Sequence, residues 1–234
     1  RQEDTDEGMD YAEIYAPVSH GRNICLAGED VAAGEVLVHA GEKLTATHLA
    51  VLAGVGQARV KVVRRVRAAL LCTGDELTQP GQPLTFGKIY DSNQMALTAR
   101  LAELGVECVQ LGELSDDPQN VADALAHAAL EADIILTTGG VSVGKKDIFH
   151  QVLPLMGAER LFWRIAMKPG SPLLCGLYQD KLMICLSGNP FAALCCFEVF
   201  AVPTLRRLSG ETSIDAKRVK TRLRGEFPKP SPGR

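Results

Sequence analysis

Four short segments of this chain carry carboxylate or hydroxyl side chains, three of them together with glycine, and each follows an apolar run that predicts a β-strand. They are residues 73–77, 115–118, 137–147 and 186–190. In an open parallel α/β sheet the loops that follow the strands lie along one edge, so these segments are expected to meet. Glycine-rich backbone, carboxylates and nearby cations in one crevice would suit a phosphorylated ligand and a divalent metal ion.

The segment 137–147, with the sequence TTGGVSVGKKD, has the most open backbone. Its small residues would let backbone N–H groups approach an anion. Lys145 and Lys146 add positive charge, and the carboxylate of Asp147 is a candidate ligand for Mg²⁺. Two simpler interpretations remain open: a tight turn after a strand, and a charged helix start capped by Asp147. The predicted anion-binding residues are Thr138, Gly139, Gly140, Ser142 and Gly144.

Carboxylates follow two further predicted strands. Asp117 stands directly before Pro118, and capping of a helix explains it fully. Asp116 has no such explanation and is the better candidate for binding a metal ion or a cationic ligand. Glu76 is a second candidate, although a turn residue on the surface is an equal interpretation.

Two basic residues and one capping loop complete the candidate site. Arg164 and Lys168 are four residues apart in a predicted strand, so both would lie on the face opposite Trp163 and could bind one anion. The alternative is an ordinary half-exposed strand. In the loop 187–190, helix capping accounts for Asn189, and the same loop could also line the ligand. The residues of that loop are Ser187, Gly188, Asn189 and Pro190.

Alternating strands and helices predict the element that positions these residues. The pattern indicates an α/β fold over residues 67–209, a doubly wound, mainly parallel sheet in three layers. Strands are expected at 66–72, 106–111, 133–136, 161–167, 172–177 and 182–186. Helices are expected after Asp91 or Ser92, after Asp117, at 148–156 and at 191–208, the last with a kink at Pro203.

The residues on either side of this domain read differently. Residues 21–66 predict a small α+β appendage, with strands at 36–38 and 58–62 around a helix from Thr45 to Ala53. Residues 1–20 are interpreted as the edge of a missing N-terminal domain. Residues 210–234 are interpreted as the start of a truncated C-terminal β domain, and the whole chain as an excised segment, since it begins at Arg1.

Composition limits the class of protein. No apolar stretch approaches the roughly twenty residues of a membrane helix, and the acidic start is unlike a signal peptide, so we expect a cytoplasmic protein with no membrane partner. The formal net charge of −3 gives no reason to expect nucleic acid as a partner. The seven cysteines are an odd number in mostly apolar surroundings, which favours buried reduced thiols over disulfides or zinc.

Several motifs occur together and in order: TGDEL at 73–77, IYDSN at 89–93, DDP at 116–118, TGGVSVG at 138–144 with Asp147, MKPG at 167–170 and SGNP at 187–190. In this order they closely resemble the molybdopterin molybdenumtransferases, the family of bacterial MoeA and of the E domain of gephyrin. The likeness runs from about residue 21 to residue 209, and the residues 28–30, Gly-Glu-Asp, also match.

The resemblance implies an enzyme of molybdenum cofactor biosynthesis. Such an enzyme takes adenylated molybdopterin and molybdate, inserts molybdenum and releases AMP with the help of Mg²⁺. It implies catalytic roles for Glu76, Asp116, Asp147 and Lys168, metal binding by Asp30, Asp116 and Asp147, and phosphate or molybdate binding by Arg164. Relatives form their site between two subunits, so the full-length protein is expected to be a homodimer.

Two departures and three rivals accompany the resemblance. Arg164 stands where many relatives have lysine, and Ser187 where proline is common, so the last loop is expected to be less rigid. Molybdopterin adenylyltransferases and a nucleotide-related hydrolase share the fold, and a gephyrin-like scaffold is a non-enzymatic alternative. This chain, lacking domains that its relatives carry, could also bind ligand without turnover.

Overall fold

The computed structural model describes residues 2–6, 8, 10–112, 114–141, 147–216, 218–222 and 224–225. The chain divides into two compact units, residues 1–60 and 61–234. The second unit contains the central sheet and all four of the loops predicted to form the site.

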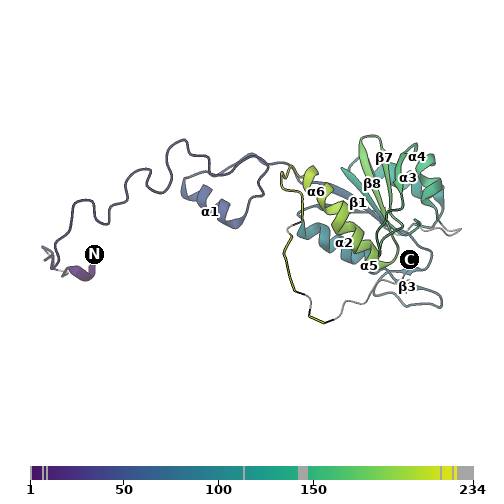
Figure 1. Ribbon diagram of the computed structural model, residues 1–234, viewed down its shortest axis with the longest axis horizontal. Helices are drawn as coiled ribbons and strands as arrows, with labels where there is room; N and C mark the ends of the chain where they lie inside the picture. The colour runs from purple at the N-terminus through teal and green to yellow at the C-terminus, as the bar shows by residue number, and fades with distance from the viewer. Residues whose placement is uncertain are drawn as a thin grey trace. The chain divides into compact units, whose positions relative to one another are not determined.

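The second unit is built on a six-stranded sheet, with helices on both of its faces (Figure 1). The order of the strands is β4-β1-β5-β8-β7-β6. The strands β4, β1, β5 and β8 run parallel, while β7 is antiparallel to both β8 and β6. A doubly wound, mainly parallel sheet was predicted, and this is confirmed. The strand bounds are β1 Arg67–Cys72, β4 Glu107–Gln110, β5 Ile134–Thr138, β6 Glu159–Trp163, β7 Leu174–Tyr178 and β8 Lys181–Leu186.

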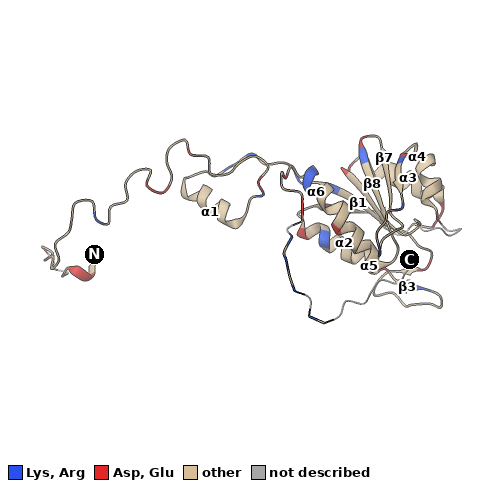
Figure 2. Cartoon of the chain, in the orientation of Figure 1, with Lys and Arg blue, Asp and Glu red and all other residues tan. Residues whose placement is uncertain are grey.

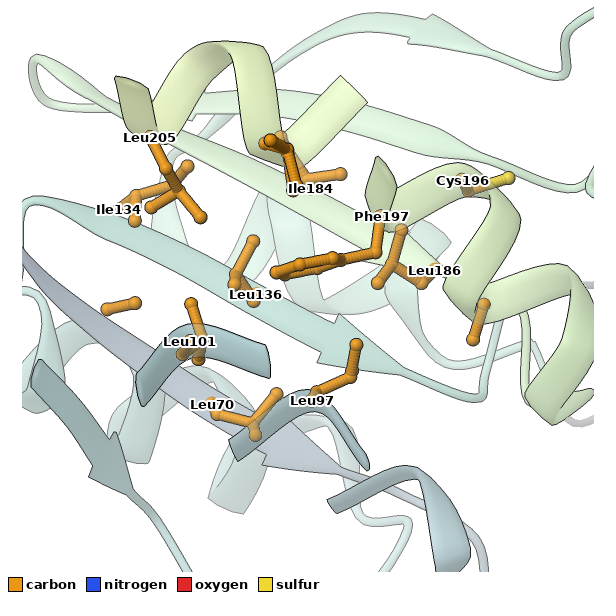
Figure 3. Close-up of a cluster of buried hydrophobic side chains, with 14 of the residues drawn as sticks. Leu70, Leu97, Leu101, Ile134, Leu136, Ile184, Leu186, Cys196, Phe197 and Leu205 are labelled. Atoms are coloured by element: carbon orange, nitrogen blue, oxygen red, sulfur yellow. The ribbon is translucent and has the colours of Figure 1, made fainter. Parts of the chain in front are cut away.

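Apolar side chains on both faces of the sheet explain why it is central. All five residues of β5 are buried, as expected for a parallel strand that is covered on both sides. One core lies between the sheet and three helices, α2 (Ser92–Glu103), α5 (Pro190–Cys196) and α6 (Val202–Leu208). A second core lies between the sheet and two helices, α3 (Pro118–Ala128) and α4 (Phe149–Met156). In the first core, the ring of Phe197 lies beside Leu136 of β5 (Figure 3).

The helices begin where the sequence predicts caps. Asp91 caps α2 (Ser92–Glu103) by accepting from the N–H of Gln94, and Asp117 caps α3 (Pro118–Ala128) in the same way. Helix α2 ends before Gly105, which has a left-handed φ of 74° that glycine adopts without strain. Helix α4 spans Phe149–Met156.

The last helical stretch is not one helix. It consists of α5 (Pro190–Cys196), a π-helical turn η2 (Phe197–Ala201) and α6 (Val202–Leu208). Pro203 was expected to kink a single helix; it has no N–H for the regular hydrogen bond, and the π turn precedes it. The basic last turn of α6, blue in Figure 2, ties the helix to the segment after it, because Arg206 donates to the carbonyls of Ile214 and Asp215 at 3.3 and 3.2 Å.

The strands of the second unit differ from the prediction in two places: one expected strand is shorter, and one short pair was not predicted. The strand predicted over 161–167 ends at Trp163, because Arg164 has a left-handed φ of 69° and breaks the extended backbone. Among the described residues of 210–225 no strand forms, and the assignment of 210–234 to the start of a β domain stays a prediction. A short parallel pair, β2 (Leu77–Thr78) and β3 (Ile89–Tyr90), was not predicted, since two-residue strands have no recognisable period.

The first unit has little regular structure. It contains a 3₁₀ turn η1 (Gln2–Asp4) and helix α1 (Ala46–Gly54), which Thr45 caps as predicted. The strands expected at 36–38 and 58–62 are absent, and Val36, Val60 and Val62 are exposed. A strand needs a partner for its backbone, and no described segment pairs with either stretch.

Ion pairs gather at the amino ends of the central strands. Arg64 binds the carboxylate of Asp133 through two nitrogens, at 2.7 and 2.5 Å. Arg67, the first residue of β1, contacts Glu107 at 3.2 Å and Glu131 at 3.1 Å. Ion pairs therefore stabilise the amino ends of these strands, and the loops predicted to form the site follow their carboxyl ends.

The cysteines are reduced and mostly shielded from solvent. All seven thiols are free; Cys72, Cys175, Cys185 and Cys196 are buried, as expected, while Cys25 is exposed. Burial raises the pKa of both Cys72 and Cys185 to about 12, which makes each a poor nucleophile. Within the described residues, every helix is too short or too polar to cross a bilayer.

Candidate ligand-binding site

A pocket of about 320 Å³ lies at the carboxyl ends of the parallel strands. Residues from all four predicted loops contribute to its wall, so the loops meet as the sequence predicts. Pro172, from the segment before β7, adds to them. The lining residues are Thr73, Gly74, Glu76, Asp116, Gly139, Gly140, Val141, Pro172, Ser187, Gly188 and Asn189.

Backbone hydrogen bonds join the floor of this pocket. The N–H of Thr73 donates to the carbonyl of Thr138 at 2.9 Å, and the N–H of Gly139 donates to the carbonyl of Leu186 at 3.2 Å. Gly139 has a φ of 87°, and a Cβ there would lie 2.2 Å from the carbonyl oxygen of Thr73. Because of both its φ and this contact, only glycine fits at position 139, where the carboxyl ends of β1, β5 and β8 lie side by side.

Two carboxylate loops hold each other at one side of the pocket. The N–H of Asp75 donates to Oδ2 of Asp116 at 3.2 Å, and the N–H of Asp116 reaches Oδ1 of Asp75 at 3.5 Å. Lys88 donates to the carbonyl of Asp75, which ties the β2–β3 segment to the same loop. The carboxylate of Glu76 lies over the backbone of Gly74. Glu76 and Asp116, one from each loop, both line the pocket.

The described lining is acidic. It includes the carboxylates of Glu76 and Asp116, and no lysine or arginine belongs to the part of the lining that the structure describes. A phosphate placed here would be repelled unless a cation lay between it and the carboxylates. The electrostatics therefore favour an anionic ligand only together with a metal ion or with positive charge from elsewhere.

The loop 187–190 is held by its own side chains. Oγ of Ser187 accepts from the N–H of Asn189 at 3.2 Å, and Oδ1 of Asn189 caps α5 by accepting from the N–H of Ala192 at 3.2 Å. From helix α2, Nδ2 of Asn93 donates to the carbonyl of Gly188 at 2.9 Å. The sequence motif 89–93 contains Asn93, but its partner is 95 residues away and no local pattern indicates it.

Asp147 is buried and is not a lining residue of the described pocket. Its side chain is 5% exposed, and its Oδ2 lies 3.4 Å from Nε2 of His150. Burial raises the pKa of Asp147 above its ordinary value, while His150 and the N–H of Phe149 act in the opposite direction. The Phe149 N–H also donates to the carbonyl of Gly140 at 3.3 Å.

The two predicted basic ligands are exposed and lie outside the described lining. The Arg164 guanidinium is 5.1 Å from the centre of the Trp163 ring, so the two side chains do not face opposite ways as predicted. The reason is the left-handed backbone of Arg164, which turns its side chain back over the ring. Lys168 follows the end of β6 and precedes a cis peptide bond to Pro169.

The remaining predicted residues divide into three groups. Thr138 is buried and serves the pocket through its carbonyl, and Pro190 is the first residue of α5. Asp30 belongs to the first unit, where it is exposed. Ser142, Gly144, Lys145 and Lys146 lie outside the described residues. Among the described residues, no group of three or more His, Cys, Asp or Glu side chains is arranged to hold a metal ion, and metal binding by Asp30, Asp116 and Asp147 stays a prediction.

Comparison with known proteins identifies the fold family. Residues 69–207 match the family described as a probable molybdopterin binding domain. The chain belongs to this family. Residues 1–56 match the family described as the MoeA N-terminal region, domain I and II. The resemblance predicted from the motifs is thus confirmed, and the matched range 69–207 holds all the pocket-lining residues.

Curated relatives in this family share a name. The chain is 37% identical over 206 residues to a molybdopterin molybdenumtransferase of Haemophilus influenzae, covering 88% of this chain and 50% of the relative. It is 37% identical over 230 residues to that of Bacillus subtilis, covering 97% of this chain and 53% of the relative. The chain thus spans about half the length of these relatives.

Solved structures agree with this family assignment. The molybdopterin biosynthesis moea protein from Pyrococcus horikosii superposes with a TM-score of 0.74 at 32% identity, covering 89% of this chain and 52% of that one. A molybdopterin biosynthesis moeA protein from Pyrococcus horikoshii OT3 gives a TM-score of 0.67 at 28% identity, covering 92% of this chain and 52% of that one. The α/β fold predicted from the sequence is therefore that of MoeA-like proteins.

Proposed function

We propose that this chain is the molybdopterin-binding part of a molybdopterin molybdenumtransferase and acts in molybdenum cofactor biosynthesis. Its substrates would be adenylated molybdopterin and molybdate, and the reaction would insert molybdenum and release AMP. The names of the relatives and the ordered motifs support this activity. Since the chain spans about half of those relatives, turnover would require the remaining parts of the protein.

One observation carries the proposal: four motif-bearing loops, far apart in sequence, line one pocket at the carboxyl edge of the sheet. Ligands of open α/β folds bind at this edge. The open glycine backbone of residues 139–141 would lie against the phosphate-bearing end of the ligand, while carboxylate oxygens can accept hydrogen bonds from the amino and N–H groups of a pterin ring.

Two carboxylates of the pocket lining could bind Mg²⁺. Glu76 and Asp116 offer hard oxygen ligands on one wall, which is the donor type that Mg²⁺ prefers. Two carboxylates leave most of an octahedral shell to water and to ligand phosphates, the usual arrangement for this ion. We propose that Glu76 and Asp116 hold Mg²⁺ and that the ion neutralises the repulsion between these carboxylates and the phosphate. Asp147 and Lys168 remain predicted contributors.

Calorimetric titration with molybdopterin, with and without Mg²⁺, tests the proposal. We expect saturable binding that Mg²⁺ strengthens, and a loss of that Mg²⁺ effect in Asp116→Asn and in Glu76→Gln. Asp117→Asn is the matched control, because asparagine also caps α3 and Asp117 lies outside the described lining. Binding that is independent of both Mg²⁺ and the two carboxylates would refute the proposed site.

The product of turnover separates the rival activities. In a full-length protein carrying this chain, a molybdenumtransferase would release AMP from adenylated molybdopterin when molybdate is present. An adenylyltransferase would instead consume ATP and release pyrophosphate. A scaffold would do neither, and it would retain peptide binding after the pocket carboxylates are replaced.

A further inference from the structure

The peptide group between Gly188 and Asn189 is held at both of its ends. Its carbonyl oxygen accepts a hydrogen bond from Nδ2 of Asn93 at 2.9 Å, and its N–H donates to Oγ of Ser187 at 3.2 Å. Gly188 and Asn189 both line the pocket, while Asn93 does not. One side chain from a distant helix and one from the loop itself thus fix the orientation of this peptide plane.

The holding side chains are well placed to resist rotation. Asn93 is 8% exposed and lies in the first turn of α2, whose cap at Asp91 is itself buried. Ser187 is 9% exposed. Gly188 lies beside Gly139, and a Cβ on Gly188 would meet the Gly139 Cα at the ordinary van der Waals distance of 3.5 Å. Since no tight contact fixes Gly188, the orientation of the peptide depends on these two hydrogen bonds.

The orientation matters because a peptide group is a dipole. A carbonyl oxygen turned toward the pocket would add partial negative charge to a lining that already includes two carboxylates. Directed to the amide of Asn93, the same oxygen is neutralised by a donor outside the lining. A phosphate-bearing ligand would then meet less repulsion at this wall.

We propose that Asn93 and Ser187 are positioning residues that clamp the Gly188–Asn189 peptide and keep its carbonyl away from the phosphate end of the ligand. The proposal rests on the proposed molybdopterin site. Proline is common at position 187 in relatives and would restrict the backbone there. In this chain the hydroxyl of Ser187 instead restrains the loop by accepting a hydrogen bond. Asn93 has no other assigned function.

Binding measurements on the whole chain test the clamp. The variants are Asn93→Leu, the isosteric Asn93→Asp, which lacks the donor, and Ser187→Ala, each compared for molybdopterin and for a pterin without phosphate. We expect about tenfold weaker molybdopterin binding in each, the usual effect of losing a buried hydrogen bond, and less than twofold change for the phosphate-free pterin. Ser187→Thr, which keeps a hydroxyl group, should bind molybdopterin more tightly than Ser187→Ala.

Two controls separate the clamp from simple loss of folding. Gln94→Leu removes the neighbouring amide of α2, which bonds to Gln79 and Gln110 away from the pocket, and should leave both affinities unchanged. The double variant Asn93→Leu with Ser187→Ala should weaken binding by less than the product of the single effects, because both act on one peptide.

The outcomes are distinct. If the unaltered chain binds molybdopterin and the variants bind it equally well, the clamp is refuted while the proposed function stands. Equal weakening for both pterins, or fully multiplicative effects in the double variant, would also overturn the clamp. If the unaltered chain binds no molybdopterin, the proposed function itself fails.

Discussion

Gly139 shows how a single residue sets the shape of the pocket floor. Its positive φ and its closeness to the Thr73 carbonyl are independent reasons for glycine at this position. We predict that Gly139→Ala lowers the free energy of unfolding by more than the roughly 1–2 kcal/mol that a left-handed residue costs, because the Cβ also collides with backbone. Chemical denaturation monitored by circular dichroism measures this.

Gly105 is the matched control for this prediction. It has a φ of 74°, and a Cβ there meets nothing within 4 Å. Gly105→Ala should therefore cost only the conformational part, about 1–2 kcal/mol. Equal losses of stability in the two variants would show that a Cβ at position 139 does not collide with the Thr73 carbonyl, and would contradict the prediction.

At the level of single residues, the sequence anticipates some roles and misses others. Asp117 was explained as a helix cap and Asp116 as the better ligand candidate; the cap is found, and Asp116 lines the pocket. Local rules suffice for such residues. Asn93 and the contact of Arg164 with Trp163 depend on partners or backbone angles that no short pattern specifies.

Among the helices, α3 offers the clearest test of capping. Asp117 accepts from the N–H of Asn120 at 2.9 Å at the start of this helix. We predict that Asp117→Ala lowers the free energy of unfolding by about 1 kcal/mol, while Asp117→Ser, which keeps the cap, costs clearly less. Thermal unfolding of the two variants decides this, and equal stability of Asp117→Ala and the unaltered chain would contradict it.

The amino edge of the sheet predicts a pH dependence. The hydrogen bonds from Arg64 are the largest cause lowering the pKa of Asp133 below 3.8. A lowered folded-state pKa means that this pair stabilises the fold above pH 3.8 and that the stabilisation is lost as the pH falls through the folded value. Arg64→Met should thus destabilise the chain at neutral pH, with a difference that shrinks below pH 3.8.

Arg65→Met serves as the control for that titration, because it removes the same charge one residue away. Urea unfolding at several pH values gives the stability difference for each variant. A difference for Arg64→Met that stays constant down to the lowest pH, or an equal one for Arg65→Met, would contradict the assignment to Asp133.

Prediction of elements succeeded where burial dominates. The strands β1, β5 and β8 have apolar runs buried on both faces, and the pattern alone indicates them. Prediction failed at 36–38 and 58–62, because apolar residues form strands only when a neighbouring backbone pairs with them. The short pair β2–β3 is formed by tertiary hydrogen bonds, including Ile89 N–H to the Glu76 carbonyl, and carries no sequence period.

Across the whole molecule, the two units differ in how much they bury. No described residue of α1 is buried, whereas β5 is entirely buried. We predict that amides of residues 46–54 exchange hydrogen rapidly and that those of 134–138 are strongly protected, because a nine-residue helix without packing is marginal in water. Hydrogen exchange with mass spectrometry of the intact chain checks this, and strong protection of 46–54 would contradict it.

The proposed function depends above all on molybdopterin binding in the pocket between the four loops. A crystal structure of this chain with molybdopterin and Mg²⁺ would locate the ligand. We expect the phosphate to lie against residues 139–141 and a metal ion to contact Glu76 or Asp116. A ligand bound elsewhere on the chain, with this pocket holding only water, would contradict the proposal.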